Sequence, residues 1–233
     1  MFSYYGSKSK IVNLYPEPAY DLIIEPFAGS ARYSLRYWQR DVILCDKYHV
    51  ITDVWKWLQK CSPKDLDALP LLRAGDKLED YDLSDEERNY LGFVISEGVS
   101  SPRKTVTQRA AKKVNYKIQN TKNILPKIRH WKIVSDSYQS LKSLQTEATW
   151  FIDPPYQNGG QHYPCSSKQI DYNDLAEFCL TRNGQVIVCE NNNANWLPFS
   201  NLKSVWGGRK SSTEVLYCNN QPIQHGLFFQ FLE

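Results

Sequence analysis

The chain has 233 residues and a mass of 27.1 kDa, which suits one α/β domain or one domain with an insertion, and excludes two large independent domains. Apolar residues make up 42% and charged residues 23% of the chain, so the composition excludes disordered and fibrous proteins. The net charge of +3 indicates no partner by itself. An aromatic content of 13% suits either stacking on flat rings or core packing.

The first third of the chain alternates strand-like and helix-like segments. Residues 21–27 and 41–46 are apolar runs of the kind that form buried parallel strands. A short helix is expected over 31–39, and a second helix over 48–60, where Ile51, Trp55 and Leu58 recur at helical spacing. This order predicts the start of a parallel, right-handed α/β sheet.

The strand pattern stops after the second helix and resumes near residue 131. Further strands are expected over 131–135, 149–156, 185–190, around 202–206 and over 213–218, with a helix over 171–182. Residues 61–129 contain weak helices and no clean buried strand. The sequence therefore predicts an open, mostly parallel Rossmann-like α/β sheet with helices on both faces, formed by residues 1–60 and 130–233, with a largely helical insertion over 61–129.

Several classes of site and location are disfavoured. The six cysteines form no C-x-x-C pair and have no histidine at ligand spacing, so we expect no metal site. No apolar run approaches the ~20 residues that span a bilayer. The N-terminal segment lacks the apolar stretch and cleavage site of a secretory signal. We expect a monomeric cytoplasmic protein that does not bind a membrane.

The charges are unevenly distributed along the predicted insertion. Seven acids lie between Asp76 and Glu87, whereas residues 98–134 contain no acid and ten Lys or Arg. A solvated basic helix is one interpretation. A positive run of this length favours contact with a nucleic acid, because a polyanion relieves its self-repulsion. The basic residues predicted to bind DNA are Arg103, Lys104, Arg109, Lys112, Lys113 and Lys117.

The tetrapeptide 153–156 follows an apolar strand, at the sheet edge where open α/β sheets bind ligands. Pro154 and Pro155 fix φ and remove two backbone donors. Asp153 is an acceptor, and Tyr156 offers a ring for stacking. Two acceptors beside a flat ring suit an exocyclic amino group on a base. The alternative is a proline-stiffened strand end with a capping aspartate.

Three other segments point to the same edge of the sheet. The first strand ends in 25–30 (EPFAGS), where Gly29 lets a cofactor approach the backbone. Asp46 ends the second strand, a position at which a carboxylate accepts ribose hydroxyls. Residues 4–8 (YYGSK) combine aromatic rings, a turn and a cation. Glu25 and Asp46 are alternatively a strand-end cap and a helix cap.

In this order the motifs resemble the Dam-like DNA adenine-N6 methyltransferases of bacteria and phages, over nearly the whole chain, although only architecturally between 61 and 129. The resemblance implies S-adenosyl-L-methionine as cofactor, double-stranded DNA as partner and 213–219 as a late strand of the family. The implied catalytic residues are Asp153, Pro154, Pro155 and Tyr156. The implied cofactor-binding residues are Tyr4, Tyr5, Gly6, Lys8, Glu25, Phe27, Ala28, Gly29, Asp46, Asp136 and Asp153. One departure is Ala31, which replaces the second glycine of the family's F-x-G-x-G pattern.

The resemblance also assigns roles. Lys8 would lie near the cofactor carboxylate, Asp46 at its ribose and Asp136 near its adenine. Asp153 and the Pro154 carbonyl would accept the two hydrogens of the target amino group, so that its lone pair faces the methyl group. The adenine must first be flipped out of the duplex and held by stacking. Residues 157–167 either close over the base or form a surface loop.

Other functions stay open from the sequence. The acceptor could be cytosine N4, an RNA adenine or a protein amide, and the chain could be a non-catalytic DNA-binding module on this scaffold. A nicotinamide dehydrogenase is disfavoured, because no G-x-G-x-x-G follows the first strand.

The C-terminal segment contains a short docking motif. Gln224, Leu227 and Phe228 fit the Q-x-x-L-F peptide by which bacterial replication proteins bind the sliding clamp. Such a peptide anchors through two apolar side chains and an amide. The alternative is an apolar tail or strand over 227–232.

Overall fold

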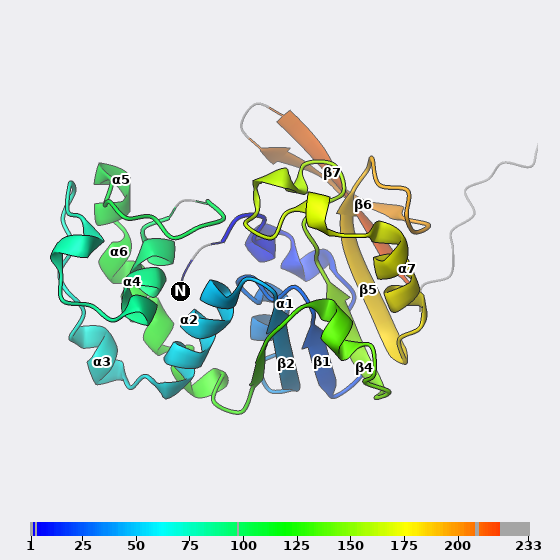
Figure 1. Cartoon of the computed structure of the whole chain (residues 1–233), viewed down its shortest axis with the longest axis horizontal. Helices are drawn as coiled ribbons and strands as arrows, with labels where there is room; N and C mark the ends of the chain where they lie inside the picture. The colour runs from blue at the N-terminus through cyan, green and yellow to red at the C-terminus, as the bar shows by residue number, and fades with distance from the viewer. Residues whose placement is uncertain (1, 3, 97, 208–209, 220–233) are drawn as a thin grey trace, which may run out of the picture.

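The computed structural model describes residues 2, 4–96, 98–207 and 210–219. A mixed seven-stranded sheet has the order β3-β2-β1-β4-β5-β7-β6 (Figure 1). The pairs among β1 to β5 are parallel, and β7 is antiparallel to both β5 and β6. The strands are β1 (Leu22–Glu25), β2 (Asp41–Asp46), β3 (Lys132–Ser135), β4 (Ala148–Ile152), β5 (Gly184–Asn191), β6 (Ser200–Gly207) and β7 (Lys210–Cys218).

Helices pack on both faces of the sheet, because successive strand residues point to opposite sides. Ile23 belongs to the apolar cluster that includes α2, whereas Ile24 belongs to the cluster that includes α7. The α-helices are α1 (Arg32–Arg36), α2 (His49–Lys60), α3 (Pro63–Asp67), α4 (Asp85–Val94), α5 (Gln108–Ala111), α6 (Val114–Lys122) and α7 (Tyr172–Leu180). The 3₁₀ turns are η1 (Lys8–Lys10), η2 (Val12–Leu14), η3 (Leu78–Asp80), η4 (Leu125–Lys127), η5 (Tyr138–Leu141), η6 (Gly160–His162) and η7 (Ser167–Gln169).

The segment between α2 and β3 is helical and lies beside the sheet, at the left of Figure 1. Its helices begin at local signals: Ser62 and Ser84 each cap a helix and bond reciprocally with an acid three residues later. Tyr90, Phe93 and Val114 belong to the same apolar cluster as Trp55 of α2. The helical segment therefore shares one continuous core with the sheet.

The predicted fold class is confirmed, and the differences are at the ends of elements. The second strand matches residue for residue. The strand expected over 149–156 ends at Ile152, because Pro154 and Pro155 have no N–H to continue the ladder. The helix expected over 31–39 is only Arg32–Arg36.

Two expectations concern features outside the sheet. Within the described part of the chain, no helix is long and apolar enough to cross a membrane. Gln224, Leu227 and Phe228 lie outside the described residues, so clamp docking stays a prediction.

Candidate active site

A cavity lies at the carboxyl ends of β1, β2 and β4, where the sequence predicts the site. Its empty volume is about 930 Å³, which includes the part open to solvent. Every predicted cofactor-binding residue except Asp136 lines it: Tyr4, Tyr5, Gly6, Lys8, Glu25, Phe27, Ala28, Gly29, Asp46 and Asp153. Segments separated by more than a hundred residues thus form one wall.

The loop after β1 is held from several sides. The Gly29 N–H donates to Asp46 Oδ2 at 3.0 Å, and the Gly29 carbonyl accepts from Trp55 Nε1 at 3.0 Å. Gly29 and Ala31 both have φ +45°, and the Tyr4 ring lies against Gly29. Only glycine adopts this left-handed conformation without cost. Ala31 therefore keeps the backbone shape of the glycine pattern at a steric cost.

Two carboxyl groups fasten this part of the site. Besides binding Gly29, Asp46 accepts the Tyr48 N–H at 2.9 Å, and burial raises the pKa of Asp46 to about 6 against these two bonds. Glu25 is 2% exposed and accepts the Ser34 N–H at 2.8 Å. Burial raises the pKa of Glu25 to about 8, so it is largely protonated at neutral pH.

Asp153 follows β4 directly and forms a buried ion pair across the site. Its Oδ1 lies 2.7 Å from Lys8 Nζ, whose side chain is 8% exposed. Burial raises the pKa of Asp153 to about 6; the Lys8 ammonium opposes this shift, and the Glu214 carboxylate adds to it. Burial alone would lower the pKa of Lys8, but Asp153 and Glu214 outweigh it and raise that pKa.

The rest of the predicted catalytic tetrapeptide is rigidly placed. The Pro155 carbonyl accepts from the Tyr172 hydroxyl, whereas no described residue donates to the Pro154 carbonyl. The half-buried Tyr156 ring lies with its centroid 4.7 Å from Lys8 Nζ, and its hydroxyl donates to Glu214 Oε1. Pro155 lines the cavity together with Asp153, whereas Pro154 and Tyr156 are not part of its lining.

The loop after the tetrapeptide forms another wall of the cavity. The Gln157 N–H donates to Glu190 Oε2 at 2.9 Å, and Tyr163 donates to the Tyr5 carbonyl at 3.2 Å. Tyr163, Cys165, Ser166, Gln169 and Ile170 line the cavity. Part of the loop therefore lies on the cavity wall, and its closure over a base stays a prediction.

Asp136 differs from the other predicted residues. Its side chain is exposed and accepts the Ser137 N–H at 2.7 Å. The residues that follow it, Ser137, Tyr138 and Gln139, line the cavity in its place.

Sequence reasoning missed two charged residues of the site. Glu214 on β7 is 6% exposed and approaches Lys8 Nζ at 3.4 Å. Arg32 lines the cavity and donates to Ser7 Oγ and the Phe2 carbonyl, both at 3.1 Å. No carboxylate of the described residues pairs with Arg32. The sequence signal for Arg32 was its position, since it is a basic residue directly after the loop that contains Gly29. Glu214 belongs to the late strand 213–219 of the resemblance, but no role in the site was expected for it.

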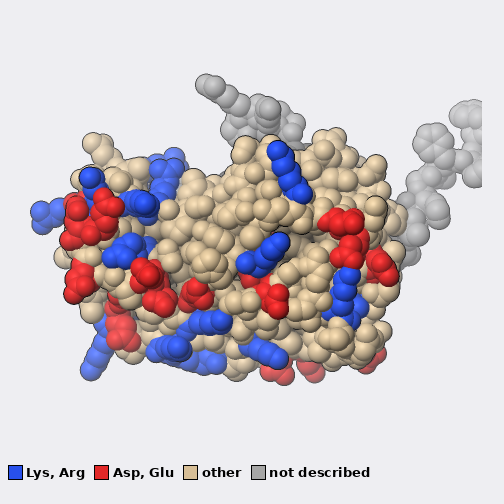
Figure 2. Space-filling view, viewed as in Figure 1, with Lys and Arg blue, Asp and Glu red and all other residues tan. Residues whose placement is uncertain are grey.

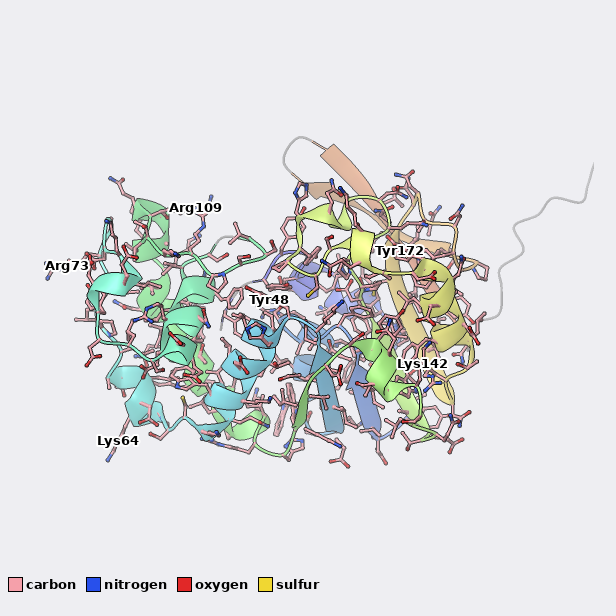
Figure 3. The ribbon with its side chains drawn as sticks, in the orientation of Figure 1. Tyr48, Lys64, Arg73, Arg109, Lys142 and Tyr172 are labelled. Carbon is pink, nitrogen blue, oxygen red and sulfur yellow. The ribbon has the colours of Figure 1, made fainter. Side chains whose placement is uncertain are left out.

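Five of the six predicted DNA-binding residues are exposed: Arg103, Lys104, Arg109, Lys112 and Lys113. Lys117 is half-buried, and its ammonium donates to the carbonyls of Val94 at 2.6 Å and Ser96 at 3.2 Å, at the end of α4. Figure 3 shows Arg109 toward the upper edge of the helical segment and Lys64 toward its lower edge. Tyr48, a cavity residue, lies between this segment and the sheet.

The basic stretch runs beside the acidic stretch in space. The Leu78 N–H donates to the Lys104 carbonyl at 2.8 Å, and the Val106 N–H donates to the Asp76 carbonyl at 2.9 Å. On the face shown in Figure 2, Lys and Arg are interspersed with Asp and Glu over the helical part. The positive run is therefore less one-signed in the fold than along the sequence.

No group of three His, Cys, Asp or Glu side chains among the described residues is arranged to hold a metal ion.

Comparisons with known proteins give structural likeness only. No protein-family model and no curated protein matches the chain. Similar solved structures include a conserved hypothetical protein of Streptococcus pyogenes, at 12% identity and TM-score 0.36 over 84% of both chains. The candidate methyltransferase yhhF of Escherichia coli has 9% sequence identity and a TM-score of 0.37, and the match covers 90% of this chain and 78% of that protein. The candidate methylase HI0767 of Haemophilus influenzae has 13% sequence identity and a TM-score of 0.37, and the match covers 85% of this chain and 78% of that protein. TM-scores below 0.5 transfer no activity to this chain.

Proposed function

We propose that this protein is an S-adenosylmethionine-dependent methyltransferase that acts on the N6 amino group of a flipped adenine in double-stranded DNA. The observation that carries the proposal is the pair of acceptors after β4. The Asp153 carboxylate lies on the cavity wall, and no described residue donates to the adjacent Pro154 carbonyl. Two adjacent acceptors match the two N–H groups of an exocyclic amine.

The residues of the cavity fit the methyl donor. Each Asp46 oxygen accepts one backbone N–H and keeps a lone pair for a ribose hydroxyl. The Arg32 guanidinium, which has no acidic partner among the described residues, suits the carboxylate of the donor's amino-acid part. Lys8 was expected in that role, but its ammonium already contacts Asp153 and Glu214. We therefore assign the donor's carboxylate to Arg32 rather than to Lys8.

The charges around the tetrapeptide favour a cationic ligand. Asp153 and Glu214 bring two carboxylates to one ammonium, that of Lys8. With both acids ionised the cluster carries one net negative charge in a buried place, where a positive ligand is stabilised. S-adenosylmethionine supplies, when bound, a methyl group on a positively charged sulfur.

Asp153 performs the chemical work that falls to the chain. By accepting one amino hydrogen while the Pro154 carbonyl accepts the other, Asp153 draws the nitrogen out of conjugation and orients its lone pair. A pKa of about 6 keeps Asp153 mostly ionised at neutral pH. The same pKa lies closer to neutrality than that of a free aspartate, so Asp153 can take the proton that leaves the methylated nitrogen.

The remaining elements present the base. Flipping an adenine out of the duplex costs a few kcal/mol. The Tyr156 ring offers a stacking surface, and the loop with Tyr163 walls the cavity. Ser100 of the helical segment donates to the His162 carbonyl of that loop, so the proposed DNA-binding region contacts the wall of the site directly.

Transfer of labelled methyl groups to unmethylated duplex DNA, followed by nucleoside analysis, tests the proposal. We expect N6-methyladenine at one sequence context. If the product is N4-methylcytosine, or if only RNA or protein is methylated, the proposed acceptor is wrong and the proposed donor stands. If calorimetry shows donor binding and no acceptor is methylated, the protein is a non-catalytic module.

A further inference from the structure

A buried carboxylate on the antiparallel strand β7 connects the parts of the site that the base would use. Glu214 pairs in register with Asn191, next to Glu190 at the end of β5. Its Oε1 accepts from the Tyr15 hydroxyl at 3.0 Å and from the Tyr156 hydroxyl, and lies 3.4 Å from Lys8 Nζ. One oxygen atom thus accepts two hydrogen bonds and takes part in an ion pair, with partners from the N-terminal segment and from the residues after β4.

The contact with Tyr156 fixes the position of a ring that would stack on the base. Rotation about χ1 swings the ring together with its hydroxyl, so a hydrogen bond at the hydroxyl restricts χ1, whereas rotation about χ2 leaves the hydroxyl in place. Stacking is worth about 1–3 kcal/mol per base, and it requires a ring that stays beside the base. A hydroxyl bound to a buried acceptor serves this purpose.

The contact with Lys8 keeps Asp153 available. In the structure the Lys8 ammonium lies 2.7 Å from Asp153 Oδ1 and over the Tyr156 ring, the two groups that the proposed function assigns to the base. When the target amino group binds to the Asp153 carboxylate, the buried Lys8 ammonium needs another anionic partner, because an unpaired buried charge is strongly destabilising. Glu214 lies within reach of it.

We propose that Glu214 is a positioning residue that holds the Tyr156 ring in place by its hydroxyl and takes over the Lys8 ammonium while Asp153 binds the target amino group. This inference rests on the proposed methyl transfer. Glu214 itself touches neither the base nor the donor. Its effect should therefore appear in turnover and in the titration of Asp153 rather than in donor binding.

The test compares Glu214→Gln with Tyr15→Phe. Glutamine retains an acceptor oxygen for the two tyrosines and removes the charge that faces Lys8. Tyr15→Phe removes the hydroxyl that donates to the same Glu214 oxygen, and the Tyr15 side chain is not part of the cavity lining. We expect Glu214→Gln to lower kcat about tenfold to hundredfold, as misplaced catalytic groups do, with donor affinity within twofold. We expect Tyr15→Phe to keep kcat within about threefold.

A second readout separates positioning from mere stability. The ionisable groups that face Asp153 are Lys8, Glu214, Glu25, Glu190, Tyr15, Tyr156, Tyr163 and Cys189. Loss of the Glu214 charge strengthens the hold of Lys8 on Asp153, so the acid limb of the kcat–pH profile should move to lower pH. NMR titration of the labelled Asp153 carboxyl should show the same displacement in the absence of DNA.

Two results would overturn the inference. One is a Glu214→Gln variant with a lower melting temperature but an unchanged kcat and pH profile, which would make Glu214 a structural contact only. The other is an unchanged Asp153 titration, which would show that the two carboxylates do not share Lys8. Absence of methyl transfer by the wild-type protein would instead refute the proposed function, and the titration would still decide the sharing of Lys8.

Discussion

Replacing Asp153 by alanine should abolish most methyl transfer while leaving the protein folded. The variant loses the ion pair with Lys8 at 2.7 Å, but the ammonium retains Glu214 at 3.4 Å and the Gly6 carbonyl at 3.3 Å. Stranding a buried charge costs about 3–5 kcal/mol. Because Lys8 keeps a carboxylate and a carbonyl, we expect a loss of only about 1–2 kcal/mol in the free energy of unfolding, well below that figure.

The effect on the rate is larger and has a different origin. Removal of one preorganised polar group from a transition state costs about 2–4 kcal/mol. At 1.36 kcal/mol per factor of ten, this corresponds to a decrease in kcat of about 30-fold to 900-fold.

Initial rates on unmethylated duplex DNA, donor calorimetry and thermal denaturation would be measured on the same preparation. Asp41→Ala is a matched control, because Asp41 is an exposed carboxylate at the start of β2, the opposite end of the sheet. We expect the control to retain its full rate. An Asp153→Ala variant that binds the donor and keeps more than about a tenth of the wild-type rate would refute the role of this carboxylate.

Four further predictions follow from charges. Reversing Lys112 and Lys113 to glutamate should weaken binding to all DNA sequences and flatten the slope of log affinity against log salt, whereas Lys64→Glu should change neither; an unchanged slope in the double variant would place the DNA elsewhere. Arg32→Met should weaken donor binding about tenfold or more in calorimetry, since a charge-assisted bond of about 1.5–3 kcal/mol is lost; unchanged affinity would contradict its assignment to the carboxylate. Lowering the pH through about 6 should reduce kcat as Asp153 protonates. The free energy of unfolding should rise as the pH falls from about 8 to 5, because carboxyls with raised pKa values bind protons more tightly in the folded state; denaturant melts at each pH would measure this, and a falling stability would contradict it.

The sheet could be predicted because its central strands β1, β4 and β5 are buried on both faces. A segment such as 41–46 must be apolar along most of its length, and few other local structures tolerate such a run between polar ends. The helical segment was harder to predict in detail. The backbone pairing of Lys77 with Thr105 joins an acidic and a basic stretch, and neither stretch signals its partner. A count of charges along the chain therefore overestimates the separation in space between the basic stretch and the acidic stretch.

The candidate site was predictable wherever it depends on strand ends, because parallel strands bring their carboxyl ends to one edge. This holds for Asp46, Asp153 and the loop around Gly29. The partners of Lys8 were not predictable in this way, since they lie 145 and 206 positions away along the chain and are chosen by side-chain packing. A basic residue near the N-terminus suggested a carboxylate partner, but the sequence could not tell a ligand's carboxylate from those of Asp153 and Glu214.

The four carboxyls at this edge of the sheet, two of them buried and two half-buried, explain why its stability and its proposed activity should respond to pH in opposite directions. Burial is the largest cause of the raised pKa of Glu25, Asp46, Asp153 and Glu190. Each ionised group therefore costs folding free energy near neutral pH, where the fold would be more stable with the same groups protonated. Asp153 must nevertheless be ionised to accept an amino hydrogen. Glu25, Asp46 and Asp153 line the cavity, so the chain gives up part of its stability to a site that a cationic donor and a hydrogen-bonding base would neutralise.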